Sequence, residues 1–316
     1  MKSRRILTAV ALLVALAFFA TGCATTQSTP AADQAADTSW QYTIIVDAAF
    51  VGQYAKVPMA EDVMIIDSRP LKPKYVKGHI PMAVSIPYSQ MDKMLDQLPE
   101  NKDSLLIFYC GGLKCKLSHK AAFKAESLGY KNVKVFAEGY PGWLKVKGNY
   151  SAVSVEWMKA QIDKGADMVI VDARPKRKKY DKGHLPGAIS IPDTQFDKFK
   201  DQLPEDKSKM LVFYCGGLKC KLSHKSAAKA IAMGYTNVKV FAEGFPGWMS
   251  VAGNYAAVDT AWVQKQIESG SDMVLVDSRP KRKKYDQGHI PTAISIPDMD
   301  FDKMIDQLPE DKTKRL

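Results

Sequence analysis

Four of the five cysteines lie in two copies of one segment, FYCGGLKCKLSHK, and this segment holds the residues best suited to chemistry. Cys110 and Cys215 each follow an apolar run and precede two glycines, and a second cysteine, Cys115 or Cys220, comes five residues later. A thiol that loses its proton becomes a nucleophile or a metal ligand. The spacing is at the wide end for zinc and only one histidine follows, so sulfur chemistry is favoured over a metal site.

The cysteine segment belongs to a longer repeat. A spacing of 105 residues relates Cys110 to Cys215, and it also relates Asp67, Asp172 and Asp277. A period of this length is a whole domain rather than a solenoid unit. We expect domains over 40–150 and 151–255, and an incomplete third over 256–316 that lacks the cysteine loop. We also expect the native protein to continue past Leu316.

Residues 151–255 show what must position each cysteine. Apolar residues at helical spacing predict helices over 155–164, 196–202 and 222–233. Short apolar runs predict strands over 168–171, 188–191, 210–214 and 238–241, and GFPGW at 244–248 reads as a turn. This alternation predicts an α/β fold of tandem units, each a parallel sheet with helices on both faces. Cys215 then stands at the carboxyl end of a strand, where sites of such sheets lie.

Three motifs in order resemble the rhodanese-like (thiosulfate sulfurtransferase) superfamily. The first is IIDSRP with GHIP, which holds Asp67, Arg69 and His79; the second is FYCGG; the third is VFAEGYPGW. The resemblance implies that Cys110 and Cys215 take the outer sulfur of thiosulfate or another sulfane donor as a persulfide. Each then passes that sulfur to a thiol acceptor. No cofactor and no metal is implied.

The resemblance also assigns the loop after each cysteine as an anion cradle. Glycines allow successive N–H groups to turn inward, a helix N-terminus adds to the field, and that field lowers the pKa of a thiol. Lysines contribute further positive charge. The cradle residues are Gly111, Gly112, Leu113, Lys114 and Lys116, and in the copy Gly216, Gly217, Leu218, Lys219 and Lys221.

Two departures from the family pattern affect the chemistry. The length of the loop resembles that of rhodanese-related phosphatases. However, it holds no arginine, and lysine cannot bind an oxyanion through two parallel hydrogen bonds. Hydrolysis of phosphate esters is therefore not expected. The second departure is the extra cysteine. Cys115 and Cys220 are either small inert residues or resolving thiols that form a disulfide with Cys110 and Cys215.

Other motif residues receive supporting roles. The pairs Asp67–Arg69 and Asp172–Arg174 are expected to brace the loop, and Trp143 and Trp248 to pack under the sheet edge. The histidines of the Gly-His motif, at 79, 184 and 289, are expected to be structural. His119 and His224 are expected at the surface, with proton transfer to the leaving thiol as the functional alternative.

The N-terminus has the layout of an export signal. Lysine and arginine precede a short apolar run over 6–19, and small residues then lead to Cys23. This resembles the lipobox of bacterial lipoproteins, which predicts a signal peptide over 1–22, lipidation of Cys23 and a flexible tether over 23–39. We therefore expect a membrane-anchored protein of the cell envelope that faces the periplasm, on the outer membrane in a Gram-negative cell.

The chain carries a formal net charge of +11 over 316 residues. The basic runs are short and repeated, as in KRKK at 176–179 and 281–284, which is typical of a solvated face, so no nucleic-acid partner is expected. Three functions stay open in the sequence. They are a sulfurtransferase, a dithiol–disulfide redox protein using Cys110/Cys115 and Cys215/Cys220, and a non-catalytic rhodanese-like binding module.

Overall fold

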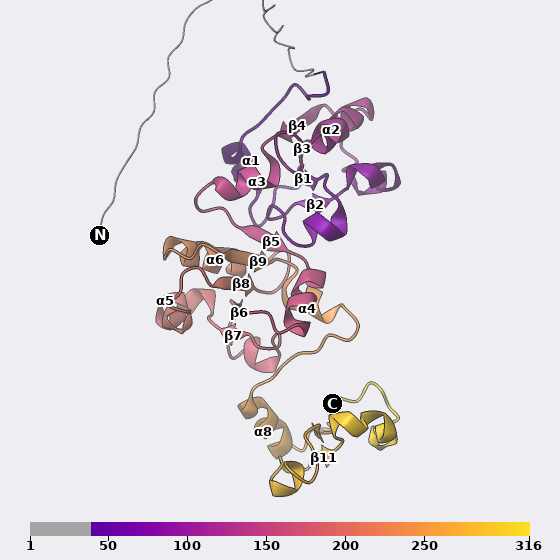
Figure 1. Ribbon diagram of the computed structural model, residues 1–316, viewed down its shortest axis with the longest axis vertical. Coiled ribbons are helices and arrows are strands. Elements are labelled where there is room, and N and C mark those ends of the chain that lie inside the picture. The colour runs from indigo at the N-terminus through magenta and orange to yellow at the C-terminus, as the bar shows by residue number, and fades with distance from the viewer. Residues whose placement is uncertain (1–38) are drawn as a thin grey trace, which may run out of the picture. The chain divides into compact units, whose positions relative to one another are not determined.

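The computed structural model describes residues 39–316, in which the repeats follow one another along the chain (Figure 1). The predicted signal peptide, Cys23 and the tether up to residue 38 lie outside the described residues. Within 39–316, no helix combines the length and the apolar character needed to cross a membrane.

The first repeat is built on a parallel sheet with the strand order β2-β1-β3-β4. Its elements are α1 (Ala48–Tyr54), β1 (Val63–Asp67), β2 (Val84–Ser85), β3 (Leu105–Tyr109), α2 (Leu117–Ser127), β4 (Asn132–Phe136) and α3 (Gly139–Lys145).

The second repeat has a five-stranded parallel sheet with the order β5-β9-β8-β6-β7. Its elements are β5 (Ser151–Val153), α4 (Val155–Asp163), β6 (Met168–Asp172), β7 (Ile189–Ser190), α5 (Phe196–Phe199), β8 (Met210–Tyr214), α6 (Leu222–Ala232), β9 (Val238–Phe241) and α7 (Gly244–Met249). The third unit contains α8 (Thr260–Glu268) and one parallel pair of short strands, β10 (Val276–Asp277) with β11 (Ile294–Ser295).

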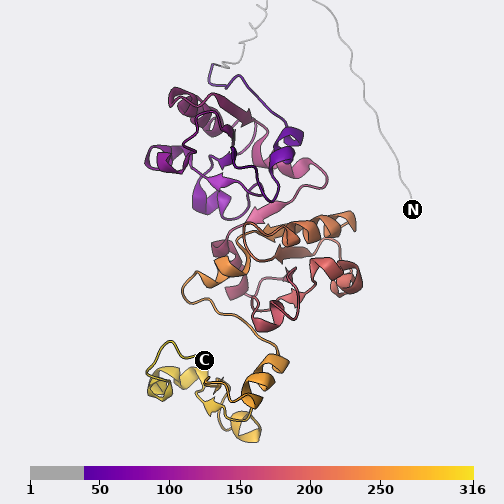
Figure 2. The same ribbon diagram turned by 180° about the vertical axis from the view of Figure 1, so that it is seen from behind.

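The central strand of each sheet is apolar on both sides because helices cover both faces. Along β3, Leu106 and Phe108 pack with α2, whereas Ile107 and Tyr109 pack with α1 and with Trp143 of α3. Figures 1 and 2 show α2 on one side of these strands and α1 and α3 on the other. Every residue of β3 is buried, as expected for a parallel strand between two helical layers. The predicted fold class is confirmed.

Two predictions for the second repeat need correction. Residues 244–248 are not a turn but the start of helix α7, because the backbone N–H of Gly247 donates to the carbonyl of Glu243 and Trp248 is buried. The single helix expected over 196–202 is instead α5, followed by a 3-10 turn at Lys200–Gln202. Trp143 and Trp248 are buried, as predicted.

Candidate active site

The cysteine loop joins β3 to α2 in the first repeat and β8 to α6 in the second. In the first, a turn closes where the N–H of Cys115 donates to the carbonyl of Gly112 at 2.8 Å. Gly112 has φ +115°, a conformation that side chains rarely adopt, which explains a glycine there. The loop therefore folds back so that its two cysteines meet at the carboxyl edge of the sheet.

A second glycine lets α3 lie against this loop. Gly139 has φ +60°, and a Cβ atom built there would stand 2.3 Å from the carbonyl oxygen of Cys110. The next residue, Tyr140, donates its backbone N–H to that same oxygen at 3.0 Å. The motif VFAEGYPGW thus fixes the cysteine loop from its far side, and only glycine at 139 allows so close an approach.

Cys110 is fully buried and its thiol is hydrogen-bonded. Its Sγ donates to the carbonyl oxygen of Cys115 at 3.1 Å and lies 3.1 Å from the hydroxyl oxygen of Ser118 on α2. A hydrogen bond with the side chain of Cys115, together with burial, raises the pKa of Cys110. The neutral thiol is therefore the form of Cys110 that this loop stabilises.

Cys115 is half-buried, and its pKa is shifted in the opposite direction to that of Cys110. Its pKa is lowered chiefly by the hydrogen bond from the Cys110 thiol, with help from the backbone N–H groups of Gly111 and Leu117 and from the charge of Arg69. Partial burial opposes this shift but does not cancel it. Of the predicted cradle residues, Gly111 therefore directs its backbone N–H at the sulfur of Cys115.

A basic pocket of about 390 Å³ opens beside this loop, and we call it the Arg69 pocket. It is lined by Arg69, Lys74, Lys77, Gly78, Gly111, Cys115, Leu117, Tyr140 and three prolines at 70, 73 and 141. Arg69 comes from the loop after β1 and so supplies the guanidinium that the cysteine loop itself lacks. Of the predicted cradle lysines, Lys114 lines an adjoining hollow that shares Gly111, Cys115 and Pro141 with the Arg69 pocket. Lys116 lies over the ring of Trp40 at 5.0 Å.

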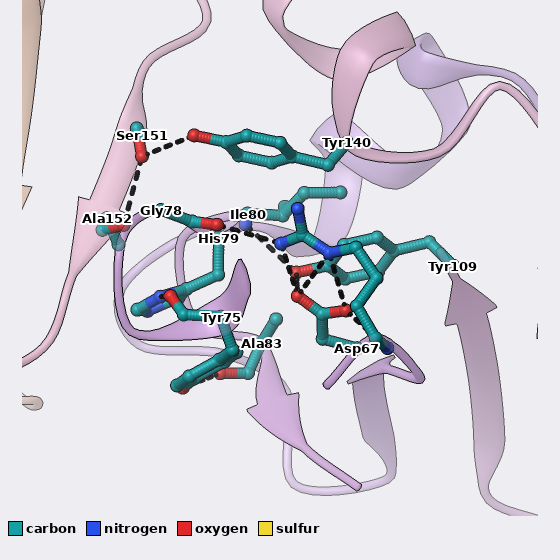
Figure 3. Close-up of polar contacts among 11 residues, drawn as sticks. Asp67, Tyr75, Gly78, His79, Ile80, Ala83, Tyr109, Tyr140, Ser151 and Ala152 are labelled. Carbon is teal, nitrogen blue, oxygen red and sulfur yellow. Dashed lines mark hydrogen bonds and ion pairs between the residues drawn. The ribbon is translucent and has the colours of Figure 1, made fainter. Parts of the chain in front are cut away.

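Arg69 is held in place by a buried network (Figure 3). Its guanidinium donates to Asp67 at 2.5 Å and to the carbonyl of Gly78 at 2.8 Å, and its Cζ lies 4.3 Å from the centre of the Tyr140 ring. Burial raises the pKa of Tyr109, so its phenol stays protonated and donates to Asp67 at 2.8 Å. The two charges are paired and every lone pair is used, which a buried ion pair needs.

The histidines fall into two structural groups. His79 stacks on Tyr75, with ring centres 3.8 Å apart, and its backbone exchanges two hydrogen bonds with Ala152 at 2.9 Å. Burial lowers the pKa of His79 to about 4, so the ring is neutral. The prediction that His119 and His224 lie at the surface is wrong. Both are buried, because Trp40 packs on the first and Tyr150 on the second.

The second repeat rebuilds the same arrangement. Cys215 is fully buried and donates to the carbonyl of Cys220 at 3.0 Å, and its sulfur lies 3.1 Å from the hydroxyl of Ser223. Cys220 lines the Arg174 pocket, of about 440 Å³. That pocket is also lined by Lys178, Lys179, Lys182 and Phe245, so lysine replaces Pro73 and phenylalanine replaces Tyr140. Arg174 is braced by Asp172 at 2.6 Å.

Sequence reasoning missed several residues of this site. Ser118 and Ser223 contact the buried thiols, Tyr109 and Tyr214 donate to the aspartates, and Lys74 and Lys77 line the mouth. The serines could have been predicted from the sequence, because each lies in the first turn of the helix that follows its cysteine loop. Residues 39–316 contain no group of three or more histidine, cysteine or acidic side chains arranged to hold a metal.

Comparison with known proteins gives consistent matches. The family described as the rhodanese-like domain matches residues 51–146, 154–251 and 259–316. A tRNA uridine(34) hydroxylase of Hamiltonella defensa subsp. Acyrthosiphon pisum is 37% identical over 83 residues, which cover 24% of this chain and 21% of that protein.

Two solved structures are similar at low identity. A thiosulfate sulfurtransferase from Pseudomonas aeruginosa is 19% identical, with a TM-score of 0.30 and coverage of 81% of this chain and 57% of its own. A 3-mercaptopyruvate sulfotransferase from Escherichia coli is 19% identical, with a TM-score of 0.26 and coverage of 65% and 99%. The chain therefore spans about a fifth of the curated relative and just over half of the first of these structures.

Proposed function

Because this chain belongs to the rhodanese-like family, we propose that it is a sulfurtransferase that carries sulfane sulfur as a persulfide on Cys110 and Cys215. The observation that supports this most is the pairing of free thiols with a basic pocket in both complete repeats. Such a pocket suits a small anionic donor such as thiosulfate, and a thiol is the acceptor.

The reaction follows from the groups in the loop. A thiolate attacks the outer sulfur of thiosulfate, the S–S bond of the donor breaks, and sulfite leaves with the bonding electron pair. The persulfide that remains is an anion, and backbone N–H groups of the loop are suited to hold it. An acceptor thiolate then attacks the outer sulfur of the persulfide and restores the protein thiolate. Each step exchanges one S–S bond for another, so no external oxidant is needed.

The location of this activity is part of the proposal. Lipidation at Cys23 and the tether after it would hold the repeats at the cell envelope, facing the periplasm. We expect the size of the protein to change when cells are treated with globomycin. We also expect mass spectrometry to find lipid on the peptide that contains Cys23. A mature protein whose first residue is not Cys23 would contradict the anchor without affecting the sulfur chemistry.

The function is tested by intact mass measurement after incubation with thiosulfate or inorganic polysulfide. We expect the wild-type chain to gain up to one sulfur atom per complete repeat. The matched control replaces the four loop cysteines by serine and keeps Cys23, and it should gain none. If the wild-type chain gains no sulfur from either donor, the sulfurtransferase function is refuted.

The adjacency of the two thiols favours a dithiol–disulfide reaction as a second candidate. The side chains of Cys110 and Cys115 are hydrogen-bonded to each other, and so are those of Cys215 and Cys220. The persulfide would then be expelled as sulfide while a disulfide closes within the loop. Stoichiometric release of sulfide with loss of both free thiols supports this candidate, and a persulfide that persists until an acceptor thiol is added excludes it.

A further inference from the structure

The two thiols of each loop differ in access to the pocket. Cys110 and Cys215 have no exposed surface, whereas Cys115 and Cys220 are half-buried and line the Arg69 pocket and the Arg174 pocket. A thiolate displaces a leaving group along the line of the donor's S–S bond, so the donor must reach the attacking sulfur directly. In this loop conformation only Cys115 and Cys220 satisfy that condition.

The hydrogen bonds place the proton on the buried thiol. Cys110 donates to a carbonyl oxygen, which can only accept, so the sulfur must keep its proton to make this bond. Burial acts in the same direction because it disfavours the charged form. Cys215 makes the same bond to the carbonyl of Cys220, and the agreement of two repeats shows that the loop sequence dictates it.

The half-buried sulfur has the opposite surroundings. The Cys110 thiol, the backbone N–H groups of Gly111 and Leu117, and Arg69 together lower the pKa of Cys115. In the second repeat the equivalent groups lower the pKa of Cys220. The sulfur that these groups favour as a thiolate is therefore the one that lines the pocket in each repeat.

We infer that donor sulfur enters each loop at Cys115 and Cys220 and reaches Cys110 and Cys215 only from there. This inference rests on the proposed sulfurtransferase function and deepens it by naming the attacking atom. The cysteine at the end of the strand is then a positioning residue in the first step, because it directs a hydrogen bond at the attacking sulfur. It becomes the second sulfur carrier afterwards.

The two steps balance without further reagents. The Cys115 thiolate attacks the outer sulfur of an anionic donor, and the donor's S–S bond breaks to release its leaving group as an anion. Cys110 then attacks the outer sulfur of the Cys115 persulfide, its proton passes to that sulfur, and Cys115 leaves as a thiolate. The products are a hydropersulfide on Cys110 and a regenerated Cys115 thiolate, so atoms, charge and electrons are conserved.

The pocket around Cys115 also indicates the class of donor. Arg69, Lys74 and Lys77 surround the approach to its sulfur, and Arg174 with three lysines surrounds Cys220. A leaving group that departs as an anion is stabilised by these charges, as sulfite from thiosulfate would be. A neutral sulfane donor such as elemental sulfur would gain nothing from them.

Two matched double variants test the entry point by intact mass and peptide mapping after thiosulfate treatment. C110S/C215S keeps a hydrogen-bond donor beside the attacking sulfur and should gain one sulfur atom in each loop, on Cys115 and Cys220. C115S/C220S should gain none. Uptake by C115S/C220S, or its absence from C110S/C215S while the wild type takes up sulfur, overturns the inference and leaves the sulfurtransferase function standing.

A second measurement needs no sulfur donor and uses the wild-type chain. Limited alkylation with iodoacetamide, followed by peptide mapping that separates Cys23, should modify Cys115 and Cys220 before Cys110 and Cys215. The alkylation rate of Cys115 should fall as the pH drops, with a midpoint below that of an ordinary cysteine, because protonation removes its thiolate. In C110A that midpoint should move to higher pH. Earlier modification of Cys110 would overturn the inference even if a serine variant fails to fold.

Discussion

The first and second repeats share an identical cysteine segment but differ at the mouth of the pocket. Pro73 and Tyr140 line the Arg69 pocket, whereas Lys178 and Phe245 take these places in the Arg174 pocket. The hydrogen bonds of the two buried thiols agree within 0.1 Å, at 3.1 and 3.0 Å. The reacting loop is therefore the same in both repeats, whereas the pocket that leads to it differs in charge and polarity.

The third unit contains a copy of the Asp–Arg pair that supports the cysteine loop in the complete repeats. Arg279 donates to Asp277 at 2.6 Å and to the carbonyl of Gly288 at 2.9 Å, as in the complete repeats. However, its side chain is 50% exposed, against 7% for Arg69. The geometry of this ion pair is therefore encoded locally, in a segment of about a dozen residues. Its energetic importance depends on whether the rest of a repeat covers it.

Loss of the aspartate should destabilise the protein far more in the Asp67–Arg69 pair than in the Asp277–Arg279 pair. Asp67→Ala leaves the buried guanidinium of Arg69 without its carboxylate, which should cost about 3–5 kcal/mol of unfolding free energy in the first repeat. Asp277→Ala is the matched control and should cost much less, since the half-exposed guanidinium of Arg279 stays hydrated without its partner. Denaturant unfolding measures both. Equal losses would show that burial does not set the value of this pair.

The next effect concerns the close approach of α3 to the cysteine loop. Gly139→Ala adds a Cβ that would meet the carbonyl oxygen of Cys110, so the first loop should lose sulfur uptake while Cys215 and Cys220 retain it. Gly148→Ala is the control, because Gly148 also has positive φ but has open space around it. Its cost should be limited to about 1–2 kcal/mol of backbone strain. Unchanged uptake by the first loop in Gly139→Ala would contradict the packing argument.

The Arg174 pocket has one lysine more than the Arg69 pocket, Lys178, and removing its charge should have a smaller effect. K178Q/K179Q removes two charges from the Arg174 pocket and should slow thiosulfate uptake at Cys220 about tenfold at low salt, by weaker steering. K283Q/K284Q makes the same change within residues 256–316, which contain no cysteine, and should leave uptake unchanged. Rates resolved by peptide mapping measure the ratio. If both variants slow uptake equally, net charge and not the pocket attracts the donor.

Exchanging the aromatic residue of the pocket between the two repeats should change stability only slightly. Tyr140 donates its hydroxyl to Ser151 at 2.8 Å, and Phe245 has no such group. Tyr140→Phe should therefore lower the unfolding free energy by about 0.5–1.5 kcal/mol, the usual value of one hydrogen bond, without changing sulfur uptake. Phe245→Tyr is the reciprocal variant. A large loss of uptake in Tyr140→Phe would instead give this hydroxyl a role in the reaction.

Local patterns were enough to predict much of this fold. Strand 210–214, helix 222–233 and the position of Cys215 between them follow from apolar periodicity and a terminal glycine, and the structure places them within a residue of the prediction. GFPGW was misread because its glycines and proline are turn formers, yet burial of Trp248 favours a helix. Such burial depends on distant residues and is not visible in a short window.

The candidate site was less accessible to sequence reasoning. His119 was misplaced because the segment that covers it, around Trp40 and Tyr42, lies far away in the chain. The different surroundings of Cys110 and Cys115 depend on one turn, closed by Gly112 at φ +115°. Spacing alone can say that two thiols are near each other. It cannot say which of them points inward.

The backbone pairing of His79 with Ala152 has a practical consequence for dissecting the chain. Ala152 belongs to β5, which completes the sheet of the following repeat, and His184 makes the same exchange with Ala257. A fragment cut at residue 150 would leave both the N–H and the carbonyl of His79 without these partners, beside the Gly78 carbonyl that anchors Arg69. A piece that keeps these bonds therefore ends after Val153 rather than at the boundary at residue 150 that the repeat predicts.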